Sequence, residues 1–359
     1  MAASLKSLIN SAKALTLGNS GSKAALKELF PVVDKAIDGE DCDDDCDSCS
    51  VQYPRSFKID EDDDLYGFVK GWSTHVLVAT GKTDWVRDIE DEKGSVMQAI
   101  AHAKGPTNGR LLLSASNIPT PHHTTSYCEP TTVLLLPAFT IIENVTPATA
   151  PTLLSAIISN APTTTSPLQP VSLPPSLPVP LPEGTPAAVK DLTTRPCPHR
   201  ALILLCSQRT RDARCGQSAP LLRREFQRHL QPLGLYRDLD DERPGGVGIY
   251  FTSHVGGHKY SANVMVYRRR DAFGVDRVRR GQLNGEEVLL PKTGGRDAKR
   301  GKEEGEEGDA GAAQCIWLAR VRPEDCEGIV KFTVLQGKVV KPERQLRGGF
   351  DRGRGLLSW

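Results

Sequence analysis

The sequence lacks the features that mark several large classes of protein. Its net charge is only +1 over 359 residues, so it has no field of one sign that would attract nucleic acid. It has no run of about 18 apolar residues, and the apolar stretch near Val133–Leu136 is far too short to cross a bilayer. No secretory apolar region precedes a cleavage-like site. We therefore expect neither nucleic acid nor a membrane among its partners.

Arginine is also missing from residues 1–27, although this segment carries lysines, no acid and a helical apolar stripe. Mitochondrial presequences favour arginine, so the segment predicts an ordinary helix rather than a transit peptide.

We predict an α/β protein of two domains. Hydrophobic residues make up 38% of the chain, so part of its length should lie outside packed cores. Pro, Thr, Gly and charged residues bury little apolar surface, and their clusters set the boundaries. The predicted parts are a flexible N-terminal segment with an acidic cysteine cluster (1–50), an N-terminal α/β domain (51–160), a Pro/Thr-rich linker or insertion (161–188), a second α/β domain (189–345) with a disordered loop (292–313), and a flexible C-terminal tail (346–359).

Apolar runs and helical spacing predict the elements of both domains. In the first domain we expect strands at 75–79, 110–114 and 132–137 and a helix at 146–158. In the second we expect a strand at 200–206, a helix at 219–231 with Pro220 in its first turn, strands at 246–253, 262–267 and 315–321, and a last helix opened by Pro323.

Two short motifs in the second domain combine the residues that bind soft metals. Cys206 ends a predicted strand, and Cys215 follows after eight polar or small residues. His254 and His258 also follow a strand, with two glycines between them that allow a close backbone approach. Two cysteines and two histidines suit zinc or an iron–sulfur cluster. Zinc sites usually place about two to four residues between paired cysteines, so the longer loop favours a two-iron cluster, although plant-type ferredoxin spacing does not match either.

These motifs resemble the thioredoxin-like [2Fe–2S] ferredoxins, and the chain as a whole resembles the sucrase/ferredoxin-like family. The segments that carry the resemblance are Thr74–Trp85, Cys206–Gly216, Gly234–Asp238, His254–Val264 and Ile316–Val321. The resemblance implies a thioredoxin-like ferredoxin fold for the second domain. It also implies that Cys206 and Cys215 bind one iron and that His254 and His258 bind the other. No pair of carboxylates stands out in a motif, so sucrose cleavage is not supported.

A cytosolic electron carrier with proton-coupled redox chemistry is therefore the predicted function, with unknown electron donor and acceptor proteins. Residues beside the ligands are expected to support the cluster or to dock an acidic partner: Arg211, Arg214, Gly216, Gly257 and Lys259. The cations among these residues could instead pair with acidic residues of the chain. Three alternatives stay open: a redox or pH sensor using the same cluster, a zinc-binding interaction module, and a thiol oxidoreductase. The last is weakened because this domain has no C-x-x-C motif.

Two further motifs lie outside this site: a run of three cysteines and the last three residues of the sequence. Cys42, Cys46 and Cys49 lie in an acidic run, where they either bind a metal transiently or are exposed thiols of a disordered segment. Leu357, Ser358 and Trp359 resemble the C-terminal signal by which clients of the cytosolic iron–sulfur assembly machinery are recognised. That signal predicts a cytoplasmic location, with a mitochondrial one as the alternative.

Overall fold

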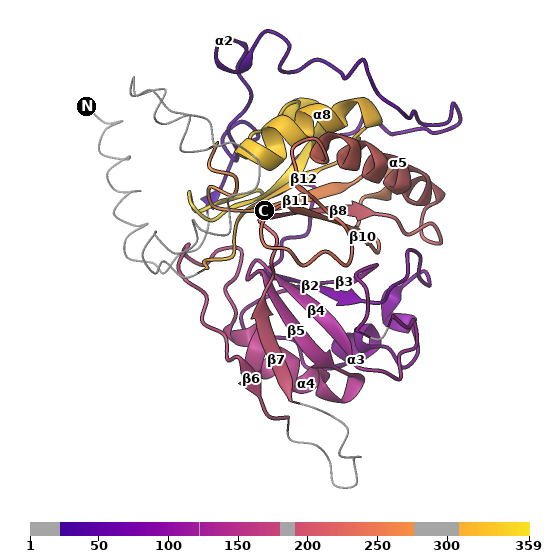
Figure 1. The fold of residues 1–359 in the computed structure, drawn as a ribbon, viewed down its shortest axis with the longest axis vertical. Coiled ribbons are helices and arrows are strands. Elements are labelled where there is room, and N and C mark those ends of the chain that lie inside the picture. Colours follow the sequence, from indigo (N-terminus) through magenta and orange to yellow (C-terminus); the bar gives the residue numbers. More distant parts are fainter. Residues whose placement is uncertain (1–21, 122, 180–190, 276–308) are drawn as a thin grey trace, which may run out of the picture.

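The computed structural model describes residues 22–121, 123–179, 191–275 and 309–359 (Figure 1). These residues form a 14-stranded mixed sheet in the order β1-β14-β13-β12-β11-β8-β10-β3-β2-β4-β5-β7-β6, with β9 paired to β10. The strands are β1 (Ser22–Lys23), β2 (Thr74–Ala79), β3 (Leu111–Ser116), β4 (Thr131–Leu136), β5 (Thr140–Val145), β6 (Ser176–Leu177), β7 (Leu192–Pro196), β8 (Ala201–Cys206), β9 (Tyr236–Arg237), β10 (Val247–Thr252), β11 (Val264–Arg269), β12 (Ala312–Leu318), β13 (Leu346–Asp351) and β14 (Leu356–Leu357).

The described helices are fewer than the strands, and all but α5 have seven residues or fewer. They are α2 (Lys35–Asp38), α3 (Val96–His102), α4 (Ala150–Thr152), α5 (Ala213–Leu230), α8 (Cys326–Gly328) and α9 (Pro342–Gln345). Further 3₁₀ and π turns extend α4 over residues 147–160 and α8 over residues 323–334. None of the helices in the described ranges combines the length and apolar composition needed to cross a membrane.

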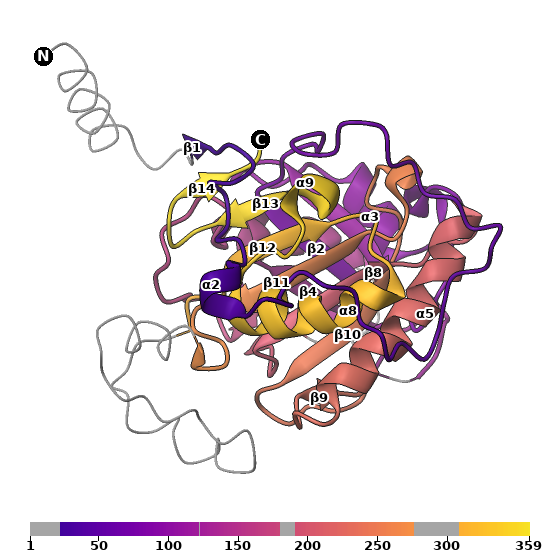
Figure 2. The ribbon, with the colours of Figure 1, turned by 90° about the horizontal axis from the view of Figure 1, so that it is seen from above.

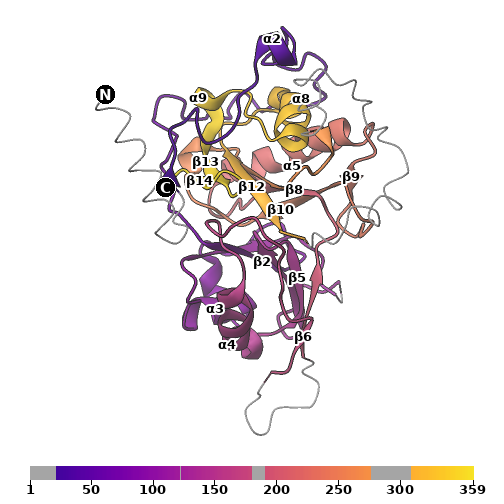
Figure 3. The ribbon, with the colours of Figure 1, turned by 90° about the vertical axis from the view of Figure 1, so that its left-hand side faces the viewer.

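The sheet bends so that its two halves pack face to face. Along β2, Leu77 belongs to an apolar cluster that also contains Leu204 of β8, while Val76 and Val78 face a different cluster with α3 and α4. The other face of β8 packs against α5 and the helix around α8. The result is a helix layer, two sheet layers and a second helix layer (Figures 1 and 3). The halves are joined where β10 meets β3, through the single pair Thr252↔Ser116.

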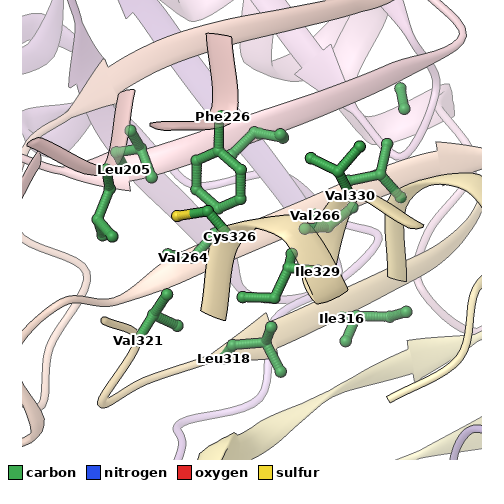
Figure 4. Close-up of a cluster of buried hydrophobic side chains, with 14 of the residues drawn as sticks. Leu205, Phe226, Val264, Val266, Ile316, Leu318, Val321, Cys326, Ile329 and Val330 are labelled. Carbon is green, nitrogen blue, oxygen red and sulfur yellow. The ribbon is translucent and has the colours of Figure 1, made fainter. Parts of the chain in front are cut away.

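The predicted elements of both domains are present, and all the strands belong to this one sheet. The two-domain arrangement and the thioredoxin-like fold therefore stay predictions. The helix predicted at 219–231 was placed too late, because α5 begins at Ala213 and Pro220 lies inside it. Its true start is set by Asp212, whose side chain accepts a hydrogen bond from Arg214 N at 2.9 Å. Phe226 on the inner face of α5 packs against Cys326 and Val264 (Figure 4).

The prediction of a flexible segment at 1–50 is wrong for residues 22–50. Leu29 and Phe30 are buried in the core beneath α5 and the helix around α8. Lys338 is only 2% exposed and forms an ion pair with Asp38 of α2, so this segment is fixed to the body of the protein. Residues 1–21 lie outside the described part of the chain.

The prediction of a flexible tail at 346–359 is also wrong, because these residues form β13 and β14 at one edge of the sheet (Figure 2). Leu357 and Ser358 are buried, and the ring centroids of Trp359 and Trp72 lie 4.4 Å apart. Gly349 has φ +136°, and a Cβ there would overlap the Cys315 backbone, so glycine allows the close strand approach. Any receptor that captured residues 357–359 would first have to separate β14 from β13.

The predicted linker at 161–188 contains ordered structure as well. Thr164 is buried and donates a hydrogen bond to the Trp72 carbonyl at 2.7 Å, and β6 pairs with β7. Residues 180–190, and residues 292–308 of the predicted disordered loop, lie outside the described part. The last residues of that predicted loop belong instead to β12, which begins at Ala312.

Candidate metal centre

Two neighbouring parallel strands bring the predicted ligands to one edge of the sheet. β8 and β10 run in the same direction, and Cys206 at the end of β8 lies opposite Thr252 at the end of β10. His254 follows two residues after Thr252. The carboxyl ends of parallel strands open onto loops at the same edge, which is a common location for ligand-binding residues. The first cysteine and the first histidine of the two motifs therefore meet because of the strand register.

Cys215 reaches the same position from the first turn of α5. Its backbone N–H donates to the Asp212 carbonyl at 3.0 Å, at the start of the helix. The loop before it is anchored to the N-terminal half of the chain. Ser207 Oγ donates to the Thr83 carbonyl at 2.8 Å, and Thr210 Oγ1 donates to Asp84 Oδ2 at 2.8 Å. This loop returns the chain so that Cys215 Sγ lies 3.4 Å from Cys206 Sγ.

The structure thus gathers three of the four predicted ligands. Cys206 Sγ lies 3.8 Å from His254 Nδ1, and the ligand atoms of Cys206, Cys215 and His254 all lie within 4.8 Å of one another. Both cysteines are buried and unbridged, whereas His254 is half-buried. His258 begins a short 3₁₀ turn that ends at Tyr260, and its side chain lies outside the described part. The centre therefore has a buried sulfur side and a more open imidazole side.

The two thiols differ in acidity. The pKa of Cys206 is lowered to about 5, chiefly by the hydrogen bond shared with Cys215; burial opposes this effect, and the contact with His254 adds to it. The same pairing, together with burial, raises the pKa of Cys215. Cys206 therefore ionises first, which suits it as a metal ligand because the thiolate is the binding form.

Arg347 of β13 supports the loop between the histidines. Its Nη1 donates to the Gly256 carbonyl and to Asn263 Oδ1, each at 2.8 Å, and its guanidinium lies 4.2 Å from the Trp317 ring centre. Burial lowers the pKa of Arg347 to about 10. A Cβ at Gly257, where φ is +67°, would lie 2.5 Å from Arg347 Cζ. No local sequence signal pointed to Arg347, because it lies 89 positions after His258 in a stretch predicted to be flexible.

Gln208 is a second supporting residue that the motif alone did not single out. It is 1% exposed, its Oε1 accepts a hydrogen bond from His254 N at 2.8 Å, and its Nε2 donates to the Val86 carbonyl at 2.5 Å. It ties the cysteine loop, the histidine loop and the N-terminal half together. Its place two residues after Cys206 was the available signal.

The predicted flanking cations form ion pairs within the chain. Arg214 pairs with Asp212 at 2.8 Å, as the alternative interpretation expected. Arg211 pairs with Asp88, and Lys259 pairs with Asp63. These contacts hold the loops of the centre against the N-terminal half. Gly216 allows the cysteine loop to pack closely, because a Cβ there would lie 2.5 Å from Arg209 Cβ.

Comparison with known proteins gives the family of this chain. The sequence model of the sucrase/ferredoxin-like family matches residues 65–348, which include the cysteine and histidine motifs, and the chain belongs to that family. No solved structure matches this chain with significance.

Curated relatives come from yeasts. Actin patches distal protein 1 of Saccharomyces cerevisiae is 51% identical over 84 residues, which cover 22% of this chain and 27% of that protein. Altered inheritance of mitochondria protein 32 of Debaryomyces hansenii is 31% identical over 140 residues, covering 39% of this chain and 33% of that protein. The protein of the same name from Clavispora lusitaniae is 27% identical over 143 residues, covering 40% of this chain and 33% of that protein. The chain therefore matches a third or less of the length of each of these relatives.

Proposed function

We propose that this protein carries single electrons on a [2Fe–2S] cluster. The proposed ligands are Cys206, Cys215, His254 and His258. The observation that supports the proposal best is the convergence of two buried thiols and an imidazole within 4.8 Å at the carboxyl edge of β8 and β10. Sulfur and imidazole donors fit iron–sulfur chemistry, whereas hard cations take oxygen ligands. The family's likeness to ferredoxins agrees with this donor set. When bound, such a cluster accepts and releases one electron at a time.

The cysteine and histidine ligands have different roles in the proposed electron transfer. Cys206 and Cys215 exclude water from the sulfur side, because both are almost fully buried. His254 is half-buried, so protons and redox partners approach through the imidazole side. An imidazole that binds a metal through one ring nitrogen keeps a second ring nitrogen that can carry a proton. We therefore propose that electron transfer is coupled to protonation of the histidines.

The charges of the ligands predict whether the redox potential lies above or below that of four-cysteine ferredoxins. Two neutral imidazoles in place of two thiolates make the ligand set less negative, which favours the reduced state. Rieske centres make the same exchange and lie roughly 250 mV or more above plant-type ferredoxins. We expect a midpoint potential above that of four-cysteine ferredoxins, falling as the pH rises between about pH 6 and pH 9. A midpoint that stays constant over this range would contradict proton coupling.

Iron and sulfide analysis of the full chain, purified without oxygen, tests the cysteine ligands. Cys206→Ser and Cys215→Ser should each lose most of the iron. Cys315→Ser is the matched control, since Cys315 is fully buried but is not one of the grouped donors, and the change should leave the iron content unchanged. Equal iron loss in all three variants would show a folding effect rather than ligation. Stoichiometric zinc in a colourless wild-type protein would instead support the zinc-binding interaction module.

The proposal extends to location and assembly. We propose a cytosolic protein that receives its cluster through recognition of Leu357, Ser358 and Trp359 by the cytosolic iron–sulfur assembly machinery. Because Leu357 and Ser358 are buried, this recognition would have to precede or displace the pairing of β14. Trp359→Ala should then lower cluster occupancy in cells while leaving reconstitution in vitro unchanged. Equal occupancy of the variant and the wild type in cells, or recovery of the protein from mitochondria, would contradict this part.

A further inference from the structure

A second group of metal-binding side chains lies at the far end of α5, away from Cys206 and Cys215. The ligand atoms of Cys46, His229 and Glu327 all lie within 4.8 Å of one another. They come from three different segments: the acidic cysteine run, the last turn of α5 and the short helix α8. We propose that these residues, with Cys49 as the fourth ligand, bind a zinc-type divalent cation.

Cys49 is not among the three residues whose ligand atoms lie within 4.8 Å of one another, and we propose it as the fourth ligand because of its spacing from Cys46 and its contact with that thiol. The Cys49 thiol lies beside the Cys46 thiol and interacts with it. Two residues separate these cysteines, which is the usual spacing of paired cysteines in structural zinc sites. Two thiolates, one imidazole and one carboxylate give four donors of the kinds that zinc binds tetrahedrally. Cys42 of the same run is buried elsewhere, outside this group.

The segment that carries the cysteines is held against α5 and α8 by contacts that do not use the proposed ligand atoms. Cys46 N donates to the Glu324 carbonyl at 2.9 Å. Ser50 N donates to Glu225 Oε1 at 3.0 Å, and Lys341 forms an ion pair with Asp45. These contacts present the thiols to His229 before any ion binds, which lowers the ordering cost of binding.

The carboxyl end of α5 favours a cation here, whereas Arg228 places a positive charge beside the ligands and has to release His229 Nε2 when that nitrogen binds the ion. His229 lies in the last turn of an 18-residue helix, where the backbone carbonyls present the negative end of the helix dipole. Arg228 Nη2 lies 3.6 Å from Cys46 Sγ and 3.0 Å from His229 Nε2, while its Nε donates to Glu225 Oε2 at 2.8 Å. Arg228 can keep its bond to Glu225 and donate to a metal-bound thiolate, as outer-shell donors commonly do at metal sites.

The geometry gives this ion a structural role rather than a catalytic one. Cys46 and His229 are half-buried, and the proposed ligands leave no position for a substrate. The ion would fasten residues 42–50 to the carboxyl end of α5, whose amino end carries Cys215. Chelation should therefore lower the thermal stability of the protein without removing iron from the first centre.

The test is metal analysis of the full chain after loading with zinc and removal of loosely bound ions. Wild-type protein should retain a single zinc ion, and Cys46→Ser and His229→Gln should each lose it with unchanged iron content. Cys128→Ser, at an exposed thiol, and Cys42→Ser are matched controls that should keep the zinc. Cobalt in place of zinc should give the absorption bands of a tetrahedral thiolate site in the wild type and in these controls, and in neither Cys46→Ser nor His229→Gln.

Each of the following results would overturn the proposed zinc site without affecting the electron-transfer proposal. Wild-type protein that retains iron but no zinc would refute the second site. Zinc that survives Cys46→Ser, or that disappears with Cys206→Ser, would assign the ion to other residues. A variant that fails to fold is recognised by loss of the iron signal as well, and Cys49→Ser then provides the independent measurement.

Discussion

Replacing Gly257 with alanine should destabilise the protein far more than the same change at its neighbour Gly256. Both glycines lie between the proposed histidine ligands, and both have positive φ, +87° at Gly256 and +67° at Gly257. Alanine in this left-handed region costs about 1 to 2 kcal/mol at either position. The two positions differ in what the new methyl group would meet.

At Gly256 the nearest atom to a new Cβ is Arg347 Nη2 at 3.8 Å, an ordinary contact distance. At Gly257 the new Cβ would lie 2.5 Å from Arg347 Cζ, so the guanidinium has to move. Arg347 is 4% exposed and donates two hydrogen bonds of 2.8 Å, to Gly256 and Asn263. Losing one hydrogen bond that involves a charged group costs about 1.5 to 3 kcal/mol. We therefore expect a total of about 2.5 to 5 kcal/mol for Gly257→Ala, against about 1 to 2 kcal/mol for Gly256→Ala.

The assay is urea unfolding of both variants and the wild type, with iron content measured on the same samples. Gly257→Ala should also lose iron more readily, because Arg347 supports the loop that carries the histidines. Equal loss of stability in the two variants would refute the role given to Arg347.

Two further predictions concern the body of the fold. His75 is buried between Tyr267 Oη and Ser114 Oγ, and burial lowers its pKa to about 3. Below about pH 6.5 His75 therefore binds a proton in the unfolded chain but stays neutral in the folded chain. The free energy of unfolding should fall as the pH is lowered from 6.5 to 4, and His75 should contribute about 1.4 kcal/mol per pH unit to this fall. An unchanged slope in His75→Gln would contradict this assignment. Phe226→Ala should cost about 3 to 5 kcal/mol in urea unfolding. Phe68→Ala, at a side chain that is 61% exposed, should change stability by about 0.5 kcal/mol or less; similar losses in both would contradict the core shown in Figure 4.

The sequence predicted the elements whose residues are buried on both faces. β8 is an uninterrupted apolar run, β2 is apolar from Val76 to Ala79, and every residue of both strands is buried in the structure. The cysteine and histidine motifs could be found in the same way, because each follows such a strand. Cys206 and His254 meet because β8 and β10 pair in parallel, with Cys206 opposite Thr252, a pairing that the sequence did not predict.

The parts that were predicted wrongly depend on contacts between distant segments. β13 reads as a polar, glycine-rich stretch, yet its residues are buried: Arg347 donates to backbone and side-chain oxygens, and Gly349 allows close strand approach. Residues 22–50 read as an acidic segment, yet Asp38 is paired with Lys338 some 300 positions away. Composition measures the average tendency to bury surface, and it misses charges and glycines that are accommodated by specific partners.

The most direct test of the proposed centre is to record visible absorption and electron paramagnetic resonance spectra of the protein purified without oxygen. The His254→Cys, His258→Cys double variant is measured beside it. Our account predicts a red-brown wild-type protein with a [2Fe–2S] signal that shifts in the variant, since sulfur replaces nitrogen at one iron. A colourless wild-type protein, or a cluster signal that is identical in the two proteins, would contradict histidine ligation at this centre.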